Sequence, residues 1–334
     1  MIYRNLGRTG VKISVLGLGT MIFGVQVGED NAIALINLAI ENGINFIDTA
    51  NVYGSFGEGV GRSEEIVGNA LKKNGKREQM VIATKVFFDM DPNDPNATGL
   101  SRKHILHQCD ASLQRLQTNY IDLYQLHRAS EVPIDETLRA LDDTIRAGKV
   151  RYIGTSEFST WQIMEALWMS DKLGLNRFIS EQAFYNLTDR SIERERIPMA
   201  LKYGIAIIPF SPLAGGVLTG KYARNKAYPG ESRLTYDVGA QLYGPSLTET
   251  VFDLLDLLAG LAESKGCTIS QLALAWTMAQ PGIPSVIIGP RTQEQLLDNL
   301  GALDIEVTEE DRKRIDEIAK PRQCIGDSHW HSGC

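Results

Sequence analysis

Cysteine is scarce in this chain, and the few cysteines form no recognisable pattern. Four occur in 334 residues, at Cys109, Cys267, Cys324 and Cys334, and none has the C-x-x-C spacing of a zinc knuckle or a redox pair. The sequence therefore predicts neither a disulfide framework nor a cysteine metal site. A reducing cytosol is the compartment that this cysteine usage favours.

Basic clusters and long apolar stretches are also missing. Lys and Arg number 34 against 41 Asp and Glu, the net charge is -7, and no run of basic residues occurs. A nucleic-acid ligand is not expected, because binding to phosphates needs clustered positive charge. No apolar run approaches the roughly 18 residues of a membrane span, and the start MIYRNLGRTG has no apolar signal core. We therefore expect a cytoplasmic protein that does not contact the membrane.

A third absence is the Rossmann signature, and no linker divides the chain. The stretch GLGTMIFG is not followed by a helix, so it is weak support for a dinucleotide-binding turn. Short apolar runs instead alternate with segments of helical spacing, which is typical of βαβ units. Eight such runs occur, the number of strands in a TIM barrel: Val15–Gly19, Asn45–Ile47, Val81–Thr84, Ile121–Leu126, Tyr152–Gly154, Phe178–Gln182, Ala206–Pro209 and Val286–Ile288.

The predicted fold is an α/β protein of the (β/α)8 TIM barrel type with an N-terminal β-hairpin, over residues 1–320, followed by a C-terminal tail, 321–334. Ser101, Ser159 and Thr292 mark the starts of helices. Extra helices are predicted in TETVFDLLDLLAGLAESKG, TISQLALAWTMAQ and TEEDRKRIDEIAK. The segment from Leu213 to Ser246 is too long for a connector and predicts a lid or ligand clamp at the C-terminal face.

Polar residues follow three predicted strands at the end where a parallel barrel carries its chemistry. Asp48, Lys85 and His127 end the second, third and fourth strands, and Tyr53 lies in the loop after Asp48. Each alone has a structural alternative, as a turn cap, a solvated amine or a packing residue. Together they suit proton transfer to a carbonyl oxygen. Lys85 can lower the phenol pKa from about 10, Asp48 can hold Lys85 charged, and His127 can orient the carbonyl.

Several motifs resemble those of the aldo-keto reductase superfamily over essentially the whole chain. They are YRNLGRTGVKISVLGLGT, DTANVYG, ATK, DLYQLH, GTSEFS, EQAFYN, PFSPLAGGVLTGKY and IIGPRTQEQLLDN. The resemblance implies that Asp48, Tyr53, Lys85 and His127 form the catalytic tetrad, with Tyr53 as general acid in the reduction of a small-molecule carbonyl substrate. It also implies a nicotinamide cofactor, NADP(H) with NAD(H) as the alternative, that lies extended across the barrel mouth.

The resemblance also assigns cofactor contacts. Ser156, Glu157 and Gln182 are expected at the carboxamide and Phe210 against the ring. Arg291, beside a helix start, suits the 2'-phosphate of NADP, its alternative being a solvent-exposed first-turn residue. The full set is Gly19, Thr20, Met21, Asp48, Ser156, Glu157, Gln182 and Phe210 near the ring, Ser211, Pro212, Leu213, Gly215, Lys221 and Arg233 near the pyrophosphate, and Gly289, Arg291, Gln295, Asp298 and Asn299 near the adenosine.

One departure from the family pattern is Glu157, where many members carry Asn. Its added negative charge predicts a preference for the cationic oxidised ring. The end of the sequence, PRQCIGDSHWHSGC, contains two histidines and two cysteines, but no two of these lie on a prepared scaffold, so no metal is expected. Trp330 in this segment is instead a candidate substrate contact.

The substrate and the oligomeric state are not predicted. Specificity is expected to come from Met21, Phe23, Phe87, Trp161 and the loops around the mouth. The resemblance includes potassium-channel β subunits, in which the same barrel and bound cofactor form a regulatory module on a membrane partner. Such subunits keep the tetrad in some cases, so the motifs alone leave this function as an alternative to the enzyme.

Overall fold

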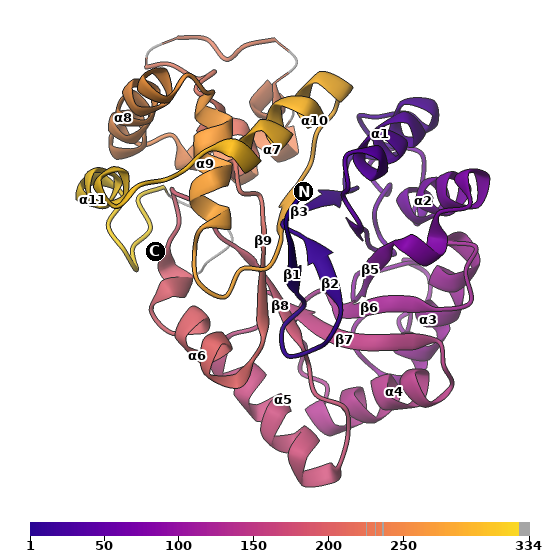
Figure 1. The fold of residues 1–334 in the computed structure, drawn as a ribbon. Helices are drawn as coiled ribbons and strands as arrows, with labels where there is room; N and C mark the ends of the chain where they lie inside the picture. Colours follow the sequence, from indigo (N-terminus) through magenta and orange to yellow (C-terminus); the bar gives the residue numbers. More distant parts are fainter. Residues whose placement is uncertain (225, 231, 236, 327–334) are drawn as a thin grey trace.

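Eight parallel strands form the barrel that the apolar runs predicted (Figure 1). The computed structural model describes residues 1–224, 226–230, 232–235 and 237–326, with the backbone alone at 237 and 238. Each predicted run coincides with or overlaps one strand, so the predicted fold is confirmed. In hydrogen-bonded order the strands are β10 (Val286–Ile288), β3 (Leu16–Gly19), β4 (Phe46–Asp48), β5 (Val81–Val86), β6 (Ile121–Leu126), β7 (Val150–Ser156), β8 (Ser180–Phe184) and β9 (Ala206–Phe210).

Helices lie around the outside of the strands (Figure 1). Ser101 and Thr292 each accept a backbone N–H from the first turn of the helix that follows, and Ser159 forms a capping box with Gln162. The predicted extra helices are α8, α9 and α11, and α8 packs against both of the others. The bounds are α1 (Glu29–Glu41), α2 (Arg62–Asn74), α3 (Arg102–Arg115), α4 (Ile134–Arg146), α5 (Thr160–Leu173), α6 (Arg196–Tyr203), α8 (Glu249–Lys265), α9 (Ile269–Met278), α10 (Gln293–Leu300) and α11 (Glu309–Ile318).

The barrel has one seam, between β9 and β10. These strands are the two ends of the sheet order, and no register pairs them in the part of the chain that the structure describes. Among the described residues, one backbone hydrogen bond spans the seam near the N-terminal ends of the two strands, from Ile207 N–H to Gly282 O at 3.0 Å. Packing closes the rest, because the interior is filled by the side chains of Phe46, Val81, Ala83, Leu123, Ile179, Ala206, Ile208 and Ile287.

A short hairpin covers the N-terminal end of the barrel, as predicted. Its strands, β1 (Tyr3–Asn5) and β2 (Lys12–Ser14), pair antiparallel. Leu6 and Ile13 have no exposed surface and pack into the barrel interior. Gly7 permits this close approach: its φ is +57°, and a Cβ there would stand 2.5 Å from the carbonyl oxygen of Ile179. The hairpin therefore plugs this end of the barrel.

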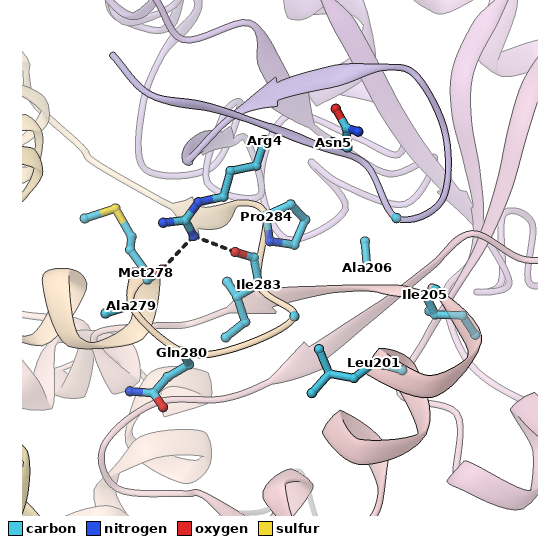
Figure 2. A pocket seen from close by; sticks show the side chains of 14 residues that line it. Arg4, Asn5, Leu201, Ile205, Ala206, Met278, Ala279, Gln280, Ile283 and Pro284 are labelled. Carbon is cyan, nitrogen blue, oxygen red and sulfur yellow. Dashed lines mark hydrogen bonds between the residues drawn. The ribbon is translucent and has the colours of Figure 1, made fainter.

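Arg4 ties the hairpin to the turn between α9 and β10 (Figure 2). Its Nη1 donates to the carbonyl oxygens of Met278 and Ile283, both at 2.7 Å. Because Met278 is the last residue of α9, the guanidinium caps the negative end of that helix. The hollow beside Arg4 lies between the hairpin, the end of α6 and the α9–β10 turn. It is at the opposite end of the strands from the residues that the sequence singled out.

The segment predicted as a long loop, Leu213–Ser246, is partly helical. Its described residues include α7 (Asp237–Tyr243) and three short 3-10 turns. Tyr243 at the end of α7 is buried, and its ring lies against Gly215, where a Cβ would stand 2.4 Å from the ring. The sequence did not reveal α7 because DVGAQLY has a central glycine and no apolar period, so packing rather than propensity determines the helix. Its role as a clamp stays a prediction.

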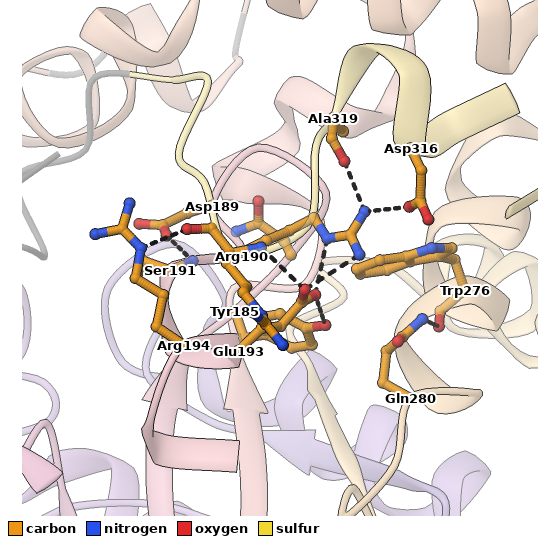
Figure 3. A network of polar contacts seen from close by, with 12 residues as sticks. Tyr185, Asp189, Arg190, Ser191, Glu193, Arg194, Trp276, Gln280, Asp316 and Ala319 are labelled. Atoms are coloured by element: carbon orange, nitrogen blue, oxygen red, sulfur yellow. Dashed lines mark hydrogen bonds and ion pairs between the residues drawn. The ribbon is translucent and has the colours of Figure 1, made fainter. Parts of the chain in front are cut away.

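A buried polar network fixes the loop after β8 (Figure 3). Arg190 donates to Glu193 Oε1 at 2.8 Å, to Asp316 Oδ1 at 2.6 Å and to the carbonyl oxygen of Ala319 at 2.6 Å. Its guanidinium lies 4.9 Å from the ring centroid of Trp276. Since the Arg190 side chain is only 7% exposed, the partners are needed to offset the burial of its charge.

The same loop holds the start of the C-terminal segment. Arg190 N–H donates to the carbonyl oxygen of Gln323 at 2.8 Å, and Ile325 N–H donates to that of Thr188 at 2.9 Å. Residues 321–326 are thus bound to the barrel by main-chain hydrogen bonds. The division into a domain over 1–320 and a tail over 321–334 stays a prediction.

Removing the acid of this network is expected to destabilise the protein. Glu193→Ala leaves Arg190 without its main carboxylate and leaves the Tyr185 hydroxyl without the acceptor that lies 2.6 Å away. We expect the free energy of unfolding to fall by about 3 kcal/mol, as for other broken buried pairs. Urea unfolding measures this loss. Glu309→Ala, which removes an exposed pair with Lys313, is the control and should leave the midpoint almost unchanged. Equal midpoints for the two variants would contradict the prediction.

Candidate active site

Asp48 and Lys85 form a buried ion pair at the C-terminal ends of neighbouring strands. Asp48 is the last residue of β4, and Lys85 lies near the end of β5. Lys85 Nζ donates to Asp48 Oδ2 at 2.5 Å and to the carbonyl oxygen of Thr49 at 2.9 Å. Burial acts to lower the pKa of Lys85, but Asp48 and Tyr53 reverse this and raise the pKa above its usual value. The amine is therefore protonated.

The phenol of Tyr53 lies against this pair. Lys85 Nζ donates to Tyr53 Oη at 3.1 Å. The loop after β4 turns back so that Tyr53 faces the ion pair, with Tyr53 N–H donating to the carbonyl oxygen of Ala50 at 3.1 Å. His127, just beyond β6, packs edge-on against the phenol, with ring centroids 5.7 Å apart. The four residues that the sequence collected from separate strands are thus adjacent.

The pKa of Tyr53 does not follow the expectation from the sequence. Burial raises the pKa of Tyr53 above its usual value and outweighs the opposing charge of Lys85, while Asp48 and Tyr243 add to the increase. The expected net lowering is therefore wrong in direction for the ligand-free protein, because it counted the cation and omitted the burial. The phenol is protonated near neutral pH, which is the form that a general acid requires.

His127 is neutral in this site. Burial lowers the pKa of His127 well below its usual value, and the charges of Lys85 and Arg128 lower it further. Its Nδ1 is buried and has no hydrogen-bond partner among the residues that the structure describes. The ring of Phe88 packs edge-on against it, with centroids 4.8 Å apart. A neutral imidazole can donate one N–H to a carbonyl oxygen without competing as the acid.

Two buried amides hold the second oxygen of Asp48. Gln125 on β6 and Gln182 on β8 donate through Nε2 to Asp48 Oδ1, at 3.1 and 2.8 Å. The sequence placed Gln182 at the cofactor but did not connect it with Asp48, and it missed Gln125 altogether. The available signal was a glutamine inside the apolar run DLYQLH, at a position where a fully buried strand normally carries an apolar side chain.

Ser156 and Gln182 lie side by side, because they are register partners on β7 and β8. Glu157, the next residue, has a left-handed backbone with φ of +56°. Its carboxylate accepts from Phe184 N–H at 2.9 Å and lies 3.8 Å from Arg196. Arg196 also contacts Glu181 at 3.5 Å, so it offsets only part of the charge of Glu157. The effect of Glu157 on an oxidised nicotinamide ring stays a prediction.

The segment after β9 meets the helix that the sequence did not reveal. Phe210 packs edge-on against Phe184, with ring centroids 5.6 Å apart. Ser211 Oγ and Tyr243 Oη share a hydrogen bond of 2.8 Å, and Asn186 Nδ2 donates to the carbonyl oxygen of Ser211 at 3.1 Å. Tyr243 is therefore a further residue of this site. A tyrosine in a segment without a clear period carried no signal of its position.

Three cations gather beside this segment. Burial lowers the pKa of Lys221, and the nearby charges of Arg291 and Arg233 lower it further. Lys221 Nζ lies over Gly216, where a Cβ would stand only 2.8 Å from the amine. Because like charges repel, an anion among them would be favoured. The arrangement fits an anionic group, and the assignment of these residues to the phosphates of a dinucleotide stays a prediction.

Two of the residues predicted to bind the adenosine make hydrogen bonds within the protein. Gln295 Oε1 accepts from Arg291 N–H at 2.8 Å and so shapes the turn before α10. Asp298 accepts from the Thr268 hydroxyl at 3.2 Å and from Gln271 Nε2 at 3.0 Å, so it also holds the start of α9. This second task of Asp298 could not be recognised from the motif.

A model of the Aldo/keto reductase family matches residues 15–320. The chain belongs to this family. It is 38% identical over 323 residues to the uncharacterized oxidoreductase YrpG of Bacillus subtilis (strain 168), covering 95% of this chain and 96% of that relative. Two plant proteins, each named a probable voltage-gated potassium channel subunit beta, are 40% (Arabidopsis thaliana) and 39% (Oryza sativa subsp. japonica) identical over 309 residues. Those matches cover 91% of this chain and 92% of each relative.

Membership in the aldo/keto reductase family makes this chain an oxidoreductase and confirms the resemblance seen in the motifs. The family acts on small-molecule carbonyl compounds and binds a nicotinamide cofactor.

The structure excludes one residue of the expected specificity set, and the others stay predictions. Met21 is 47% exposed and Trp161, on α5, is 65% exposed. Phe87 packs edge-on against Phe88, with ring centroids 5.3 Å apart. Phe23 has no exposed surface, so the expectation that it contacts substrate is wrong. From the sequence, an aromatic residue near the end of a strand could lie either in the core or at the rim of the barrel.

No group of three or more His, Cys, Asp or Glu side chains within the described ranges is placed to hold a metal ion. His329, Trp330, His331 and Cys334 lie outside those ranges. The Cys324 thiol donates to the carbonyl oxygen of Gly326 at 2.6 Å. None of the helices described in this aldo/keto reductase is both long and apolar enough to cross a membrane.

Proposed function

We propose that this aldo/keto reductase reduces an aldehyde or ketone with NADPH, with Tyr53 as the general acid. The observation that carries the proposal is the position of Lys85, whose amine donates to both Asp48 and the Tyr53 phenol. A neutral His127 beside the phenol ring supports it. A protonated phenol, a fixed cation and a neutral imidazole are the groups that proton delivery to a carbonyl oxygen needs.

In the proposed reaction, His127 and Tyr53 bind and orient the carbonyl oxygen. A bound reduced nicotinamide supplies the hydride. As negative charge develops on the carbonyl oxygen, Tyr53 Oη transfers its proton to that oxygen. Lys85, 3.1 Å from Tyr53 Oη, stabilises the phenolate that remains, and Asp48 keeps Lys85 charged and oriented. Ser156 and Gln182 would hold the carboxamide, and Lys221, Arg233 and Arg291 the phosphates.

A direct assay tests the proposal. Purified protein is mixed with NADPH and with sugars, small aldehydes, ketones and pyridoxal in turn, and NADPH oxidation is followed by absorbance. Turnover of at least one carbonyl compound that disappears in the Tyr53→Phe variant supports the assignment. An absence of turnover across the whole panel, in protein shown to bind NADPH, argues against the enzyme.

Cofactor choice provides a separate prediction. If Arg291 binds the 2'-phosphate, the protein should prefer NADPH to NADH, and Arg291→Ala should weaken NADPH far more than NADH. A hydrogen bond to a charged group contributes roughly 1.5–3 kcal/mol, so the dissociation constant for NADPH should rise about tenfold to somewhat over a hundredfold. Fluorescence titration of both cofactors measures this change.

The matched control is Arg139→Ala, which removes an exposed arginine on α4. It should leave both dissociation constants unchanged, so any effect of net charge alone is excluded. Equal weakening of NADPH and NADH by Arg291→Ala would show that Arg291 shapes the turn, through the hydrogen bond from its N–H to Gln295, and does not bind the phosphate.

A regulatory module like a potassium-channel β subunit is the second candidate. The two plant relatives carry that name at about the same identity as the bacterial oxidoreductase. Co-purification with a membrane protein, together with negligible turnover of all carbonyls, would favour it. The contact among the tetrad residues agrees with either function, so the turnover measurement decides between them. A cytoplasmic location is part of the proposal for either function.

A further inference from the structure

Asp48 is the only carboxylate in the tetrad, and its two oxygens have different partners. Oδ2 accepts from Lys85, whereas Oδ1 accepts from the amides of Gln125 and Gln182. Gln125 is the register partner of Lys85 on the adjacent strand, so the two side chains enter the barrel mouth side by side. On its other side Gln125 faces Gly154, which has no side chain to compete for the space.

Gln125 is costly to bury as an ordinary core residue. It has no exposed surface, and its Oε1 is buried without a hydrogen-bond partner in the described structure. A leucine or methionine at this position would avoid that unsatisfied oxygen. The amide is oriented by Asp48, since the opposite orientation would place two acceptor oxygens against each other. The contact with Asp48 is thus what this polar side chain provides.

The two glutamines are not equivalent. Gln182 is also a candidate for the cofactor carboxamide, so its amide has a second use in the proposed function. Among the described residues, Gln125 donates to Asp48 alone. We propose that Gln125 is a positioning residue of the proposed reaction. Its hydrogen bond to Oδ1 fixes the Asp48 carboxylate so that Oδ2 faces Lys85. The same hydrogen bond offsets part of the negative charge of Asp48 that acts on the phenol.

The groups that face the phenol determine the direction of the effect. Lys85 favours the phenolate, whereas Asp48 and Tyr243 disfavour it, and His127 beside it is neutral. Loss of the Gln125 amide leaves the negative charge of Asp48 less screened. The phenolate then becomes less stable, and the pKa of Tyr53 should rise.

Two variants test this inference. Gln125→Met keeps the volume but removes the donor, so kcat should fall about tenfold, with the carbonyl KM and the NADPH dissociation constant changed less than twofold. The alkaline limb of the kcat profile should move to higher pH. Gln125→Glu keeps the shape. When protonated it can donate to Asp48, and when ionised it repels Asp48, so its activity should approach wild type at acid pH and fall as the pH rises.

The control is Thr277→Val, which removes the donor of another fully buried polar side chain, a hydroxyl on α9 that donates to the carbonyl oxygen of Ala273 at 3.0 Å. It should leave the pH profile unchanged. Thermal melting of each variant confirms folding. A wild-type kcat and pH profile in Gln125→Met, or an equal loss at every pH in Gln125→Glu, would overturn the inference.

The inference rests on the proposed function, but its failure is distinguishable from a failure of that function. Ultraviolet difference titration of cofactor-free protein, with Tyr53→Phe subtracted, follows the ionisation of Tyr53 without turnover. An upward shift of this titration in Gln125→Met supports the positioning role even if no carbonyl substrate is found. An unshifted titration contradicts it even if the wild type is an active reductase.

Discussion

Replacing Tyr53 with phenylalanine is expected to lower carbonyl reduction by about 10²–10⁴-fold or more, the largest effect that we predict, while NADPH binding stays close to wild type. The change removes the hydroxyl that Lys85 contacts at 3.1 Å and keeps the ring that packs on His127. Losses of this size are usual when a general acid is removed. Single-turnover rates with NADPH and the best carbonyl from the panel measure the effect.

Tyr124→Phe is the matched control for the loss of a buried phenol. Tyr124 has no exposed surface, and its hydroxyl lies 3.4 Å from the carbonyl oxygen of Ile105, its only hydrogen-bond partner among the described residues. This variant should keep turnover within about threefold of wild type, since general acid catalysis is untouched. If Tyr53→Phe retained comparable turnover, the acid would have to be another group.

Replacing Lys85 with methionine should produce the second largest effect. The phenolate loses its stabilising cation, so we expect kcat to fall by about 10²-fold or more. The sign of the pH effect follows from the forces on Tyr53. Burial raises its pKa and Lys85 lowers it, so removing Lys85 raises the pKa further and moves the alkaline limb of activity to higher pH. The pH dependence of kcat measures both changes.

The buried Asp48 complicates this variant, because it is left without its cation. Stability should fall by about 3 kcal/mol. The double variant Asp48→Asn with Lys85→Met removes both charges, so it should recover much of that stability and remain inactive. Unfolding in urea separates the two outcomes. A Lys85→Met protein that is folded, active and unshifted in its pH profile would leave Lys85 a structural role only.

The strand ends could be predicted from the sequence because a parallel barrel brings them to one face. Asp48, Lys85 and His127 each follow an apolar run, and the alternation of eight such runs with helical segments predicted that these runs are barrel strands. The capped helix starts were equally visible, since Ser101 and Thr292 accept hydrogen bonds from their own first turns. Local patterns of this kind are encoded within a few residues.

Features that depend on tertiary packing could not be predicted in this way. The pKa of Tyr53 depends on burial, which no short motif records. Glu157 pairs with Arg196, and Asp298 accepts a hydrogen bond from Gln271. Both contacts join residues that are distant along the chain, so no local motif indicates them. Tyr243 belongs to a helix that packing determines. In the sequence, Gln125 is only one polar residue in an apolar run, and nothing near it indicates that it contacts Asp48.

The seam between β9 and β10 has a consequence for how the fold responds to a ligand. The residues proposed for the pyrophosphate follow β9, and those proposed for the adenosine follow β10. A dinucleotide bound as proposed would therefore bridge the one junction that the strand ladder leaves open. Ligand addition should therefore slow amide exchange mainly in β9, β10 and the loops that follow them. The bound ligand would link two strands that the backbone hydrogen bonds of the sheet do not join.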